Sequence, residues 1–93
     1  MEQTPYSVTY HPLVAKDIAH LDTHWYHEIR AAIEEKLMSQ PEIFGSPLRQ
    51  SLRGYRKLRV GDYRIVYRIH RKVVKVLGII HRSDGYRMLE KRM

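Results

Sequence analysis

The fold is decided by residues 51–86, which read SLRGYRKLRVGDYRIVYRIHRKVVKVLGIIHRSDGY. Three runs rich in Val, Ile, Leu and Tyr follow one another here and predict three strands, over about 55–60, 63–70 and 73–80. Gly61 and Asp62 separate the first two runs, and glycine tolerates the positive φ that a two-residue hairpin turn requires. We therefore predict a tight hairpin centred on Gly61 and Asp62.

A two-residue turn also determines which residues oppose one another, so that Arg59 lies opposite Arg64. Because side chains alternate along a strand, the hairpin has two different faces. The first face is apolar and consists of Leu58, Val60, Tyr63, Ile65, Tyr67 and Ile69, with Arg56 at its far edge. The second face is predicted to be cationic and consists of Tyr55, Lys57, Arg59, Arg64, Val66 and Arg68.

The cationic face has a cost that folding alone does not explain. Like charges opposite each other on neighbouring strands destabilise a sheet, and no Asp or Glu occurs on these two strands to relieve the repulsion. Residues 1–46 contain three Lys/Arg and seven Asp/Glu, a net of −4, whereas residues 47–93 contain fourteen and three, a net of +11. This asymmetry favours a polyanionic partner such as a phosphate backbone.

The N-terminal half predicts one strand and two helices. Residues 6–11 alternate with period two and predict a strand whose inward residues are Tyr6, Val8 and Tyr10. A short first helix follows, with apolar residues at helical spacing at Val14, Ile18 and Leu21. Asp22 and Thr23 provide the N-cap signal of a second helix, whose apolar stripe comprises Trp25, Ile29, Ala32, Ile33 and Leu37. Pro41 ends that helix, and residues 42–47 are predicted to form a loop.

These elements predict an α+β fold in the order β-α-α-β-β-β-α. The sheet is small, twisted, four-stranded and mainly antiparallel, with the N-terminal helical hairpin on its apolar face and a short C-terminal helix. A length of 93 residues suits one domain over residues 1–93. No apolar run approaches the roughly 20 residues of a membrane span, and no signal pattern opens the chain. The absence of cysteine is consistent with a cytoplasmic location.

The connection between the third and fourth strands is less regular, because Arg71-Lys72 is not a favoured two-residue turn. If the turn is nevertheless that short, His81 is expected on the cationic face and Arg82 just past the end of the strand. Tyr86 then lies near the rim of the sheet. His20, His24 and His27 have the spacings of helical metal ligands, but Asp22-Thr23 interrupts the helix between them, so no metal site is predicted.

The segments LRGYRKLRVGDYRIVYRI (residues 52–69) and HRSDGY (residues 81–86) resemble the RelE/ParE superfamily of bacterial toxins from type II toxin–antitoxin systems, and the RelE branch in particular. The resemblance covers nearly the whole chain. It implies a ribosome-dependent, metal-independent endoribonuclease without a cofactor. Such an enzyme cuts mRNA in the ribosomal A site, where it also contacts 16S rRNA, and its cognate antitoxin is a small protein that folds over the basic sheet.

Carried over by motif, the resemblance implies that the working residues are Lys57, Arg59, Arg64, Arg82 and Tyr86. The matched segment before the GDYR turn is shorter here, so either Lys57 with Arg59 or Arg56 with Lys57 fills the two basic roles. His81 is a further acid/base candidate, since some relatives rely on a histidine near this position. The remaining candidates for RNA binding are Arg53 and Arg68.

The chemistry is intelligible from the side chains. RNA is cleaved without added water when its own 2′-OH attacks the adjacent phosphorus and leaves a 2′,3′-cyclic phosphate. Lys57 or Tyr86 is then expected to take the 2′-OH proton, and the arginines to stabilise the developing charge. His81 or a group of the substrate supplies the proton for the 5′-oxygen. Two other interpretations stay open: a ParE-like toxin that inhibits DNA gyrase without nuclease activity, and a nucleic-acid-binding relative that has lost catalysis.

Overall fold

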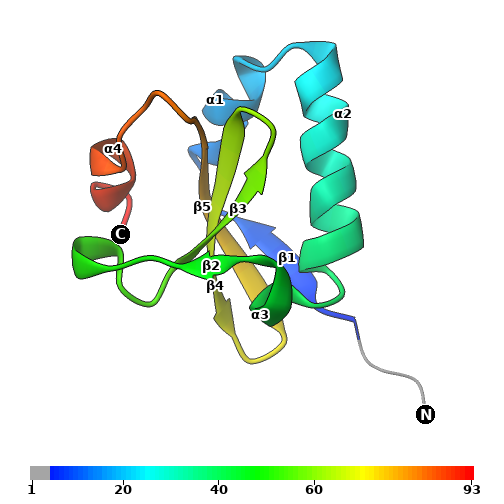
Figure 1. The fold of residues 1–93 in the computed structure, drawn as a ribbon, viewed down its shortest axis with the longest axis vertical. Coiled ribbons are helices and arrows are strands. Elements are labelled where there is room, and N and C mark those ends of the chain that lie inside the picture. The colour runs from blue at the N-terminus through cyan, green and yellow to red at the C-terminus, as the bar shows by residue number, and fades with distance from the viewer. Residues whose placement is uncertain (1–4) are drawn as a thin grey trace.

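The computed structural model describes residues 5–93 and has a five-stranded sheet in the order β1-β5-β4-β3-β2. The strands are β1 (Ser7–Tyr10), β2 (Ser46–Pro47), β3 (Arg56–Val60), β4 (Tyr63–His70) and β5 (Val73–His81). The helices are α1 (Val14–Ala19), α2 (Thr23–Ala32), α3 (Pro41–Phe44) and α4 (Arg87–Glu90). A π-helical segment (Ile33–Leu37) continues α2, and a 3₁₀ turn (Gln50–Leu52) precedes β3. Figure 1 shows α2 and α4 on opposite sides of the sheet.

The predicted fold class is confirmed, but the predicted strand number is wrong by one. Ser46 and Pro47 pair antiparallel with Lys57 and Arg56 and form the additional edge strand β2. The loop predicted over residues 42–47 is therefore wrong as well, because its first half belongs to α3. Pro41 does not simply end the preceding helix: it occupies the first turn of α3, where a missing N–H costs nothing.

The predicted hairpin is confirmed residue by residue. β3 and β4 pair with Val60 opposite Tyr63 and Arg59 opposite Arg64, and Gly61 adopts a φ of +58°. A Cβ at Gly61 would also overlap the indole of Trp25, which lies against the turn. Glycine is therefore required here for both the backbone angle and the close approach of α2.

The apolar face of the hairpin packs against α1 and α2, as predicted. Asp22 caps α2 by accepting a hydrogen bond from the Trp25 backbone N–H at 2.9 Å. The stripe of α2 is buried at four positions and half-buried at Trp25, whose ring lies 5.5 Å from that of Tyr63. This first apolar cluster is formed by buried residues of both layers, namely Val14, Ile29, Ala32, Ile33, Leu37, Leu58, Ile65, Tyr67, Val74, Val76 and Ile79.

The inward orientation predicted for Tyr10 is wrong, because its side chain is 49% exposed. Tyr6 and Val8 do pack against the first apolar cluster. β1 is an edge strand that pairs with β5 only, and Tyr10 stands at its C-terminal end, where it lines a groove of about 680 Å³ with Tyr26 of α2. Alternation in the sequence predicts which side chains share a face, but it does not reveal that this end of the strand lies open at the groove.

The second face of the hairpin is not purely cationic, which corrects the prediction. A second apolar cluster lies on it and consists of Leu52, Val66, Leu77, Ile80 and Leu89, flanked by Leu48, Tyr55 and Tyr86. The segment before β3 and helix α4 supply residues to this cluster and cover part of the face. The sheet is thus buried on both sides along β5, which explains why that strand is apolar throughout except at Lys75 and at its last residue, His81.

A bulge in β5 changes the face on which its last residues lie. The turn at Arg71-Lys72 has only two residues, with His70 opposite Val73. Further along, Tyr67 pairs with Val76 but Val66 pairs with Gly78, so Leu77 has no partner on β4. The extra residue reverses the alternation beyond this point. His81 consequently lies opposite Tyr63, with ring centroids 5.2 Å apart, rather than on the face of Arg64.

Tyr67 is fully buried and donates a hydrogen bond of 2.7 Å to the Pro41 carbonyl. Burial raises the pKa of Tyr67 above its ordinary value of 10.0. The native state therefore holds this proton more tightly than the unfolded state does. The contribution of Tyr67 to the unfolding free energy is complete below about pH 10 and falls as the pH rises above it. Tyr67→Phe is expected to lose about 1–2 kcal/mol of unfolding free energy at pH 8, because the Pro41 carbonyl loses its partner.

This difference in unfolding free energy between Tyr67→Phe and wild type is expected to shrink above about pH 10. There the unfolded wild-type chain loses the Tyr67 proton while the native state keeps it, which lowers the stability of the wild type only. Urea unfolding of both proteins at pH 8 and near pH 10.5 measures it. A difference that grows with pH would contradict this account of the hydroxyl.

No helix within residues 5–93 combines the length and the apolar character that a membrane span needs.

Candidate functional site

The cationic side chains surround the second apolar cluster on one face of the sheet. The pairing register aligns Arg59, Arg64 and Ile80 in one row across β3, β4 and β5, and Lys57, Val66 and Gly78 in the next row. Lys57 and Arg64 are half-buried, and Arg59 is exposed. The prediction that Lys57, Arg59 and Arg64 share a face is confirmed by this register. These cations therefore lie beside the buried residues of the second apolar cluster, on the same face of the sheet.

Arg64 and Tyr86 are brought together from distant parts of the chain. The Arg64 guanidinium lies over the Tyr86 ring at 5.9 Å from its centroid, and Nη1 donates a long hydrogen bond of 3.4 Å to the hydroxyl oxygen. Tyr86 directly precedes α4, and its ring also contacts the second apolar cluster. A hydroxyl and a guanidinium are thereby presented together at the edge of the basic face.

Arg82 directly follows β5 and lies at the β3–β4 turn. Its backbone N–H donates to the Asp62 carbonyl at 2.7 Å, which extends the pairing of β4 and β5 by one step. The Arg82 guanidinium also forms an ion pair of 3.7 Å with the Asp62 carboxylate, and both side chains are at least half exposed. An exposed pair of this kind is weak, so Arg82 remains available to an anionic ligand. The sequence analysis assigned Asp62 to the turn only and did not predict its ion pair with Arg82.

Arg56 does not belong to the basic face. Its Nη2 donates to the backbone carbonyls of Glu42 at 2.7 Å and Gly45 at 2.5 Å, on the side of the first apolar cluster. These bonds hold α3 and the chain before β2 against the sheet. Of the two pairs left open by the sequence, Lys57 with Arg59 therefore shares the face of Arg64, and the prediction that Arg56 contacts RNA is not supported by its position.

The other predicted RNA-binding arginines line the opposite end of this face. Arg68 is exposed and lies 5.9 Å from the centroid of the Tyr55 ring, which leaves an aromatic ring and a cation side by side. Arg68 also pairs with Lys75 of β5, a cation that the sequence prediction did not include because its face depends on the register of β5. Arg53 is exposed just after the 3₁₀ turn.

His81 is separated from the other candidates by the bulge. Its ring packs edge-on against Tyr63, and Nδ1 lies 2.7 Å from the Ser83 hydroxyl and accepts a hydrogen bond from the Ser83 backbone N–H. The prediction that His81 shares the face of Arg64 is wrong. No group of three or more His, Asp or Glu side chains arranged to hold a metal ion occurs among residues 5–93.

The sequence and the fold match known proteins. A family model described as the ParE toxin of the type II toxin–antitoxin system parDE matches residues 8–86. Toxin RelE of Mycobacterium tuberculosis is 38% identical over 92 residues, which cover 90% of this chain and 89% of the relative. Toxin RelG of the same organism is 37% identical over 90 residues, which cover 89% and 98% of the two chains. These matches define the class: the chain is a toxin of a type II toxin–antitoxin system.

Solved structures agree with this class. The toxin–antitoxin complex RelBE2 of M. tuberculosis contains a chain with a TM-score of 0.79 and 29% identity, and the match covers 89% of this chain and 98% of that one. The RelB–RelE complex of Methanococcus jannaschii gives a TM-score of 0.64 at 20% identity, over 80% and 90% of the chains, which shows a shared fold. The chain belongs to the RelE/ParE superfamily, and among its toxins it is of the RelE family.

Proposed function

We propose that the protein is an endoribonuclease that cuts mRNA in the ribosomal A site, without a metal ion, and so inhibits translation. The observation that carries the proposal is the contact between Arg64 and Tyr86 at the edge of a face that also presents Lys57, Arg59 and Arg82. A guanidinium beside a hydroxyl offers charge stabilisation and proton transfer within the reach of one phosphodiester. The RelE resemblance of the sequence supports the same reaction.

In the proposed reaction the 2′-OH attacks the adjacent phosphorus, the bond to the 5′-oxygen breaks, and a 2′,3′-cyclic phosphate remains. Arg64 and Arg82 stabilise the charge that develops on the phosphorane, because a planar guanidinium matches two phosphate oxygens. Tyr86 or Lys57 takes the proton of the 2′-OH. The proton for the 5′-oxygen comes from a group of the substrate, because the His81 ring packs on Tyr63 at the opposite face of the sheet.

Binding of the RNA is assigned to the rest of the basic face. Arg59, Arg53 and Arg68 provide the phosphate contacts, and Tyr55 beside Arg68 provides a surface on which a base can stack. Polyanion binding also relieves the repulsion between Arg59 and Arg64, which lie directly opposite each other. The proposed location is the cytoplasm, where mRNA is translated.

Primer extension on a translated mRNA tests this function. The purified protein is expected to produce cuts between codon positions only when ribosomes are present, and the upstream product is expected to carry a 2′,3′-cyclic phosphate. Cutting of naked RNA at equal rate would remove the ribosome from the proposal. No cutting under either condition would remove the nuclease.

One finding favours a second candidate, since the family model that matches residues 8–86 is described as the ParE toxin. A ParE-like toxin would inhibit DNA gyrase and would not need Arg64 beside Tyr86. A supercoiling assay with purified gyrase separates the two candidates. Inhibition of supercoiling together with intact mRNA would favour the second.

We also propose a cognate antitoxin as the partner of this chain. Two of the similar structures are complexes of toxin and antitoxin, RelBE2 of M. tuberculosis and RelB–RelE of M. jannaschii. The net charge of +7 suits an acidic segment that covers the basic face and so blocks access of RNA. Co-expression with the product of the neighbouring reading frame, followed by co-purification, tests for this partner.

The placements of Tyr86 and His81 predict different mutational effects. Tyr86→Phe removes the hydroxyl next to Arg64 but keeps the ring, and it is expected to slow single-turnover cleavage by about 10²-fold or more if the hydroxyl transfers the proton. His81→Ala is expected to have an effect at least about tenfold smaller, because the imidazole packs on Tyr63 at the other face. Cleavage of mRNA on programmed ribosomes across pH measures both.

The reverse order of the two effects would contradict the assignment. In that case the imidazole supplies the proton. Near wild-type rates in both variants would shift the catalytic role to Lys57.

A further inference from the structure

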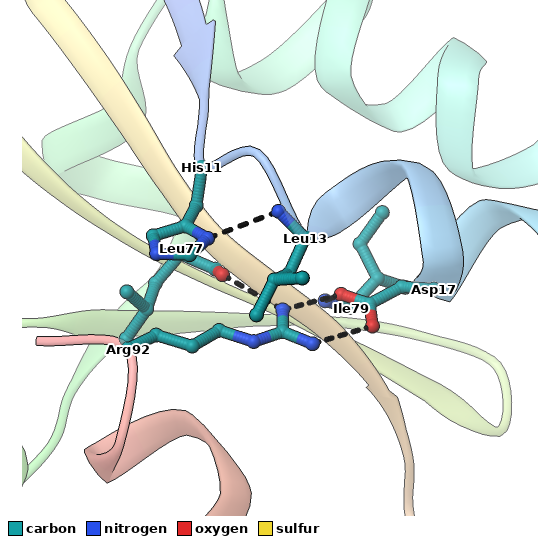
Figure 2. A network of polar contacts seen from close by, with 6 residues as sticks. All are labelled: His11, Leu13, Asp17, Leu77, Ile79 and Arg92. Carbon is teal, nitrogen blue, oxygen red and sulfur yellow. Dashed lines mark hydrogen bonds and ion pairs between the residues drawn. The ribbon is translucent and has the colours of Figure 1, made fainter.

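A buried ion pair connects the segment after α4 to helix α1. Arg92 donates from Nη1 to Oδ2 of Asp17 at 2.8 Å and from Nη2 to Oδ1 at 2.9 Å, and the two side chains are only 5% and 6% exposed. Figure 2 shows the Arg92 side chain extended along the sheet toward Asp17. Buried charges persist only when they are paired and hydrogen-bonded; here both Nη atoms are bonded, and Nε of Arg92 is buried without a partner.

The ion pair also satisfies two backbone groups that the sheet leaves open. β1 pairs with β5 only as far as Val76, so within residues 5–93 no strand lies next to this edge of β5 beyond Val76. There Arg92 donates to the Leu77 carbonyl at 3.1 Å, and Asp17 accepts from the Ile79 backbone N–H at 3.0 Å (Figure 2). The pair therefore caps the open edge of β5 at the bulge.

Gly78 shows that β5 is shaped for this contact. A Cβ at position 78 would overlap Leu89 of α4 and would lie 2.8 Å from Nη1 of Arg92. Glycine in the interior of a buried strand is unfavourable unless another part of the chain approaches closely. The segment from α4 to Arg92 is that part.

Helix α4 has only four residues and cannot hold its own position. Its place is set by Leu89, which is fully buried in the second apolar cluster, and by Arg92 one turn further on. The Leu89 backbone N–H donates to the Tyr86 carbonyl at 2.9 Å, so Tyr86 and Leu89 belong to the same turn. The position of the Tyr86 ring over Arg64 thus depends on how the segment after it is fixed.

We propose that Asp17 and Arg92, which lie at the open edge of β5 behind α4, are positioning residues for Tyr86. Their ion pair holds the turn at α4 so that the Tyr86 hydroxyl lies beside the Arg64 guanidinium. The inference rests on the proposed function where it concerns cleavage. Its structural part, the position of the Tyr86 ring, does not depend on any activity.

The first experiment needs no activity. 3-Fluorotyrosine is placed at position 86 and its ¹⁹F resonance is recorded in Arg92→Met, which keeps the side-chain length but removes the guanidinium. Lys91→Met is the matched control, because it removes one charge from the neighbouring, exposed position. The resonance is expected to move toward that of unfolded protein in Arg92→Met, to stay in place in Lys91→Met and to return partly in Arg92→Lys. An unchanged resonance in folded Arg92→Met would overturn the proposal.

The second experiment is a double-mutant cycle on single-turnover cleavage at saturating protein. Arg92→Met is expected to lower the maximal rate by about tenfold to a hundredfold with little change in the half-saturating concentration, because displacement by about 1 Å is sufficient for such a loss. In a Tyr86→Phe background the same substitution is expected to have little further effect. Equal losses in both backgrounds would mean that the pair acts on the fold in general, which overturns the proposal.

Two results would change which experiment tests the positioning of Tyr86. If wild type does not cleave RNA, the proposed function fails, and the ¹⁹F comparison alone decides the positioning. If Arg92→Met does not fold, the double substitution Asp17→Asn with Arg92→Met replaces it, because it removes both buried charges together. A Tyr86 resonance at the wild-type position in that protein would equally overturn the proposal.

Discussion

Arg64→Ala is expected to abolish growth arrest and to lower the cleavage rate by about 10²–10³-fold, the usual cost of removing one preorganised donor to developing charge. The guanidinium contacts the Tyr86 ring and hydroxyl, so its loss removes both a phosphate ligand and the partner of the proposed proton acceptor. The fold should be retained, because the side chain lies on the basic face and its removal ends the repulsion with Arg59 opposite.

Arg30→Ala is the control for charge. Arg30 is exposed on α2, at the other side of the sheet, and its ion pair of 3.6 Å with Glu34 is worth only a few tenths of a kcal/mol. Both variants are expressed at equal level, and growth, cleavage and thermal unfolding are measured. Undiminished growth arrest in Arg64→Ala would contradict a catalytic role, and a clear loss of thermal stability would show that Arg64 supports the fold.

Arg92→Met is expected to lower the unfolding free energy by about 3–5 kcal/mol, because it leaves the Asp17 carboxylate buried without its partner. This is a large share of the roughly 5–15 kcal/mol by which a domain is stable. In the wild-type protein the hydrogen bonds that Arg92 donates to Asp17 raise the pKa of Arg92 above its already high ordinary value, so the pair stays charged. Two backbone groups at the bulge are affected at the same time.

Urea unfolding of wild type, Arg92→Met and the control Lys91→Met measures this effect. The double substitution Asp17→Asn with Arg92→Met is expected to be more stable than Arg92→Met alone, because no unpaired charge remains inside. A loss below about 1 kcal/mol in Arg92→Met would mean that water reaches the carboxylate and that the pair is in effect a surface pair.

The parts of the fold that follow from short-range chemistry could be predicted from the sequence. The GD turn sets the register of β3 on β4, and the N-cap at Asp22 sets the start of α2. The positions of Lys57, Arg59 and Arg64 follow from that register. These predictions needed nothing beyond the geometry of a two-residue turn and the alternation of side chains.

The parts that failed depend on contacts between distant segments. The bulge at Leu77 reversed the face of His81, and its one signal in the sequence is Gly78, a glycine within an apolar strand. The register confirms Arg56 at the edge of the apolar face, but the RNA contact also predicted for it could not be checked against the Glu42 and Gly45 carbonyls, to which its guanidinium donates. The pair of Arg92 with Asp17, a residue 75 positions away, has no local signal in the sequence from which it could be predicted.

The parallel pairing of β1 with β5 has a consequence for the order in which the chain folds. The meander β3-β4-β5 is closed by two-residue turns and can form early, whereas β1 and the Asp17–Arg92 pair must wait for segments more than sixty residues apart to meet. Contacts that form after the transition state govern unfolding rather than refolding. We therefore expect substitutions at Asp17 and Arg92 to raise the unfolding rate while hardly changing the folding rate. The lifetime of the folded toxin then depends on this one ion pair between distant segments of the chain.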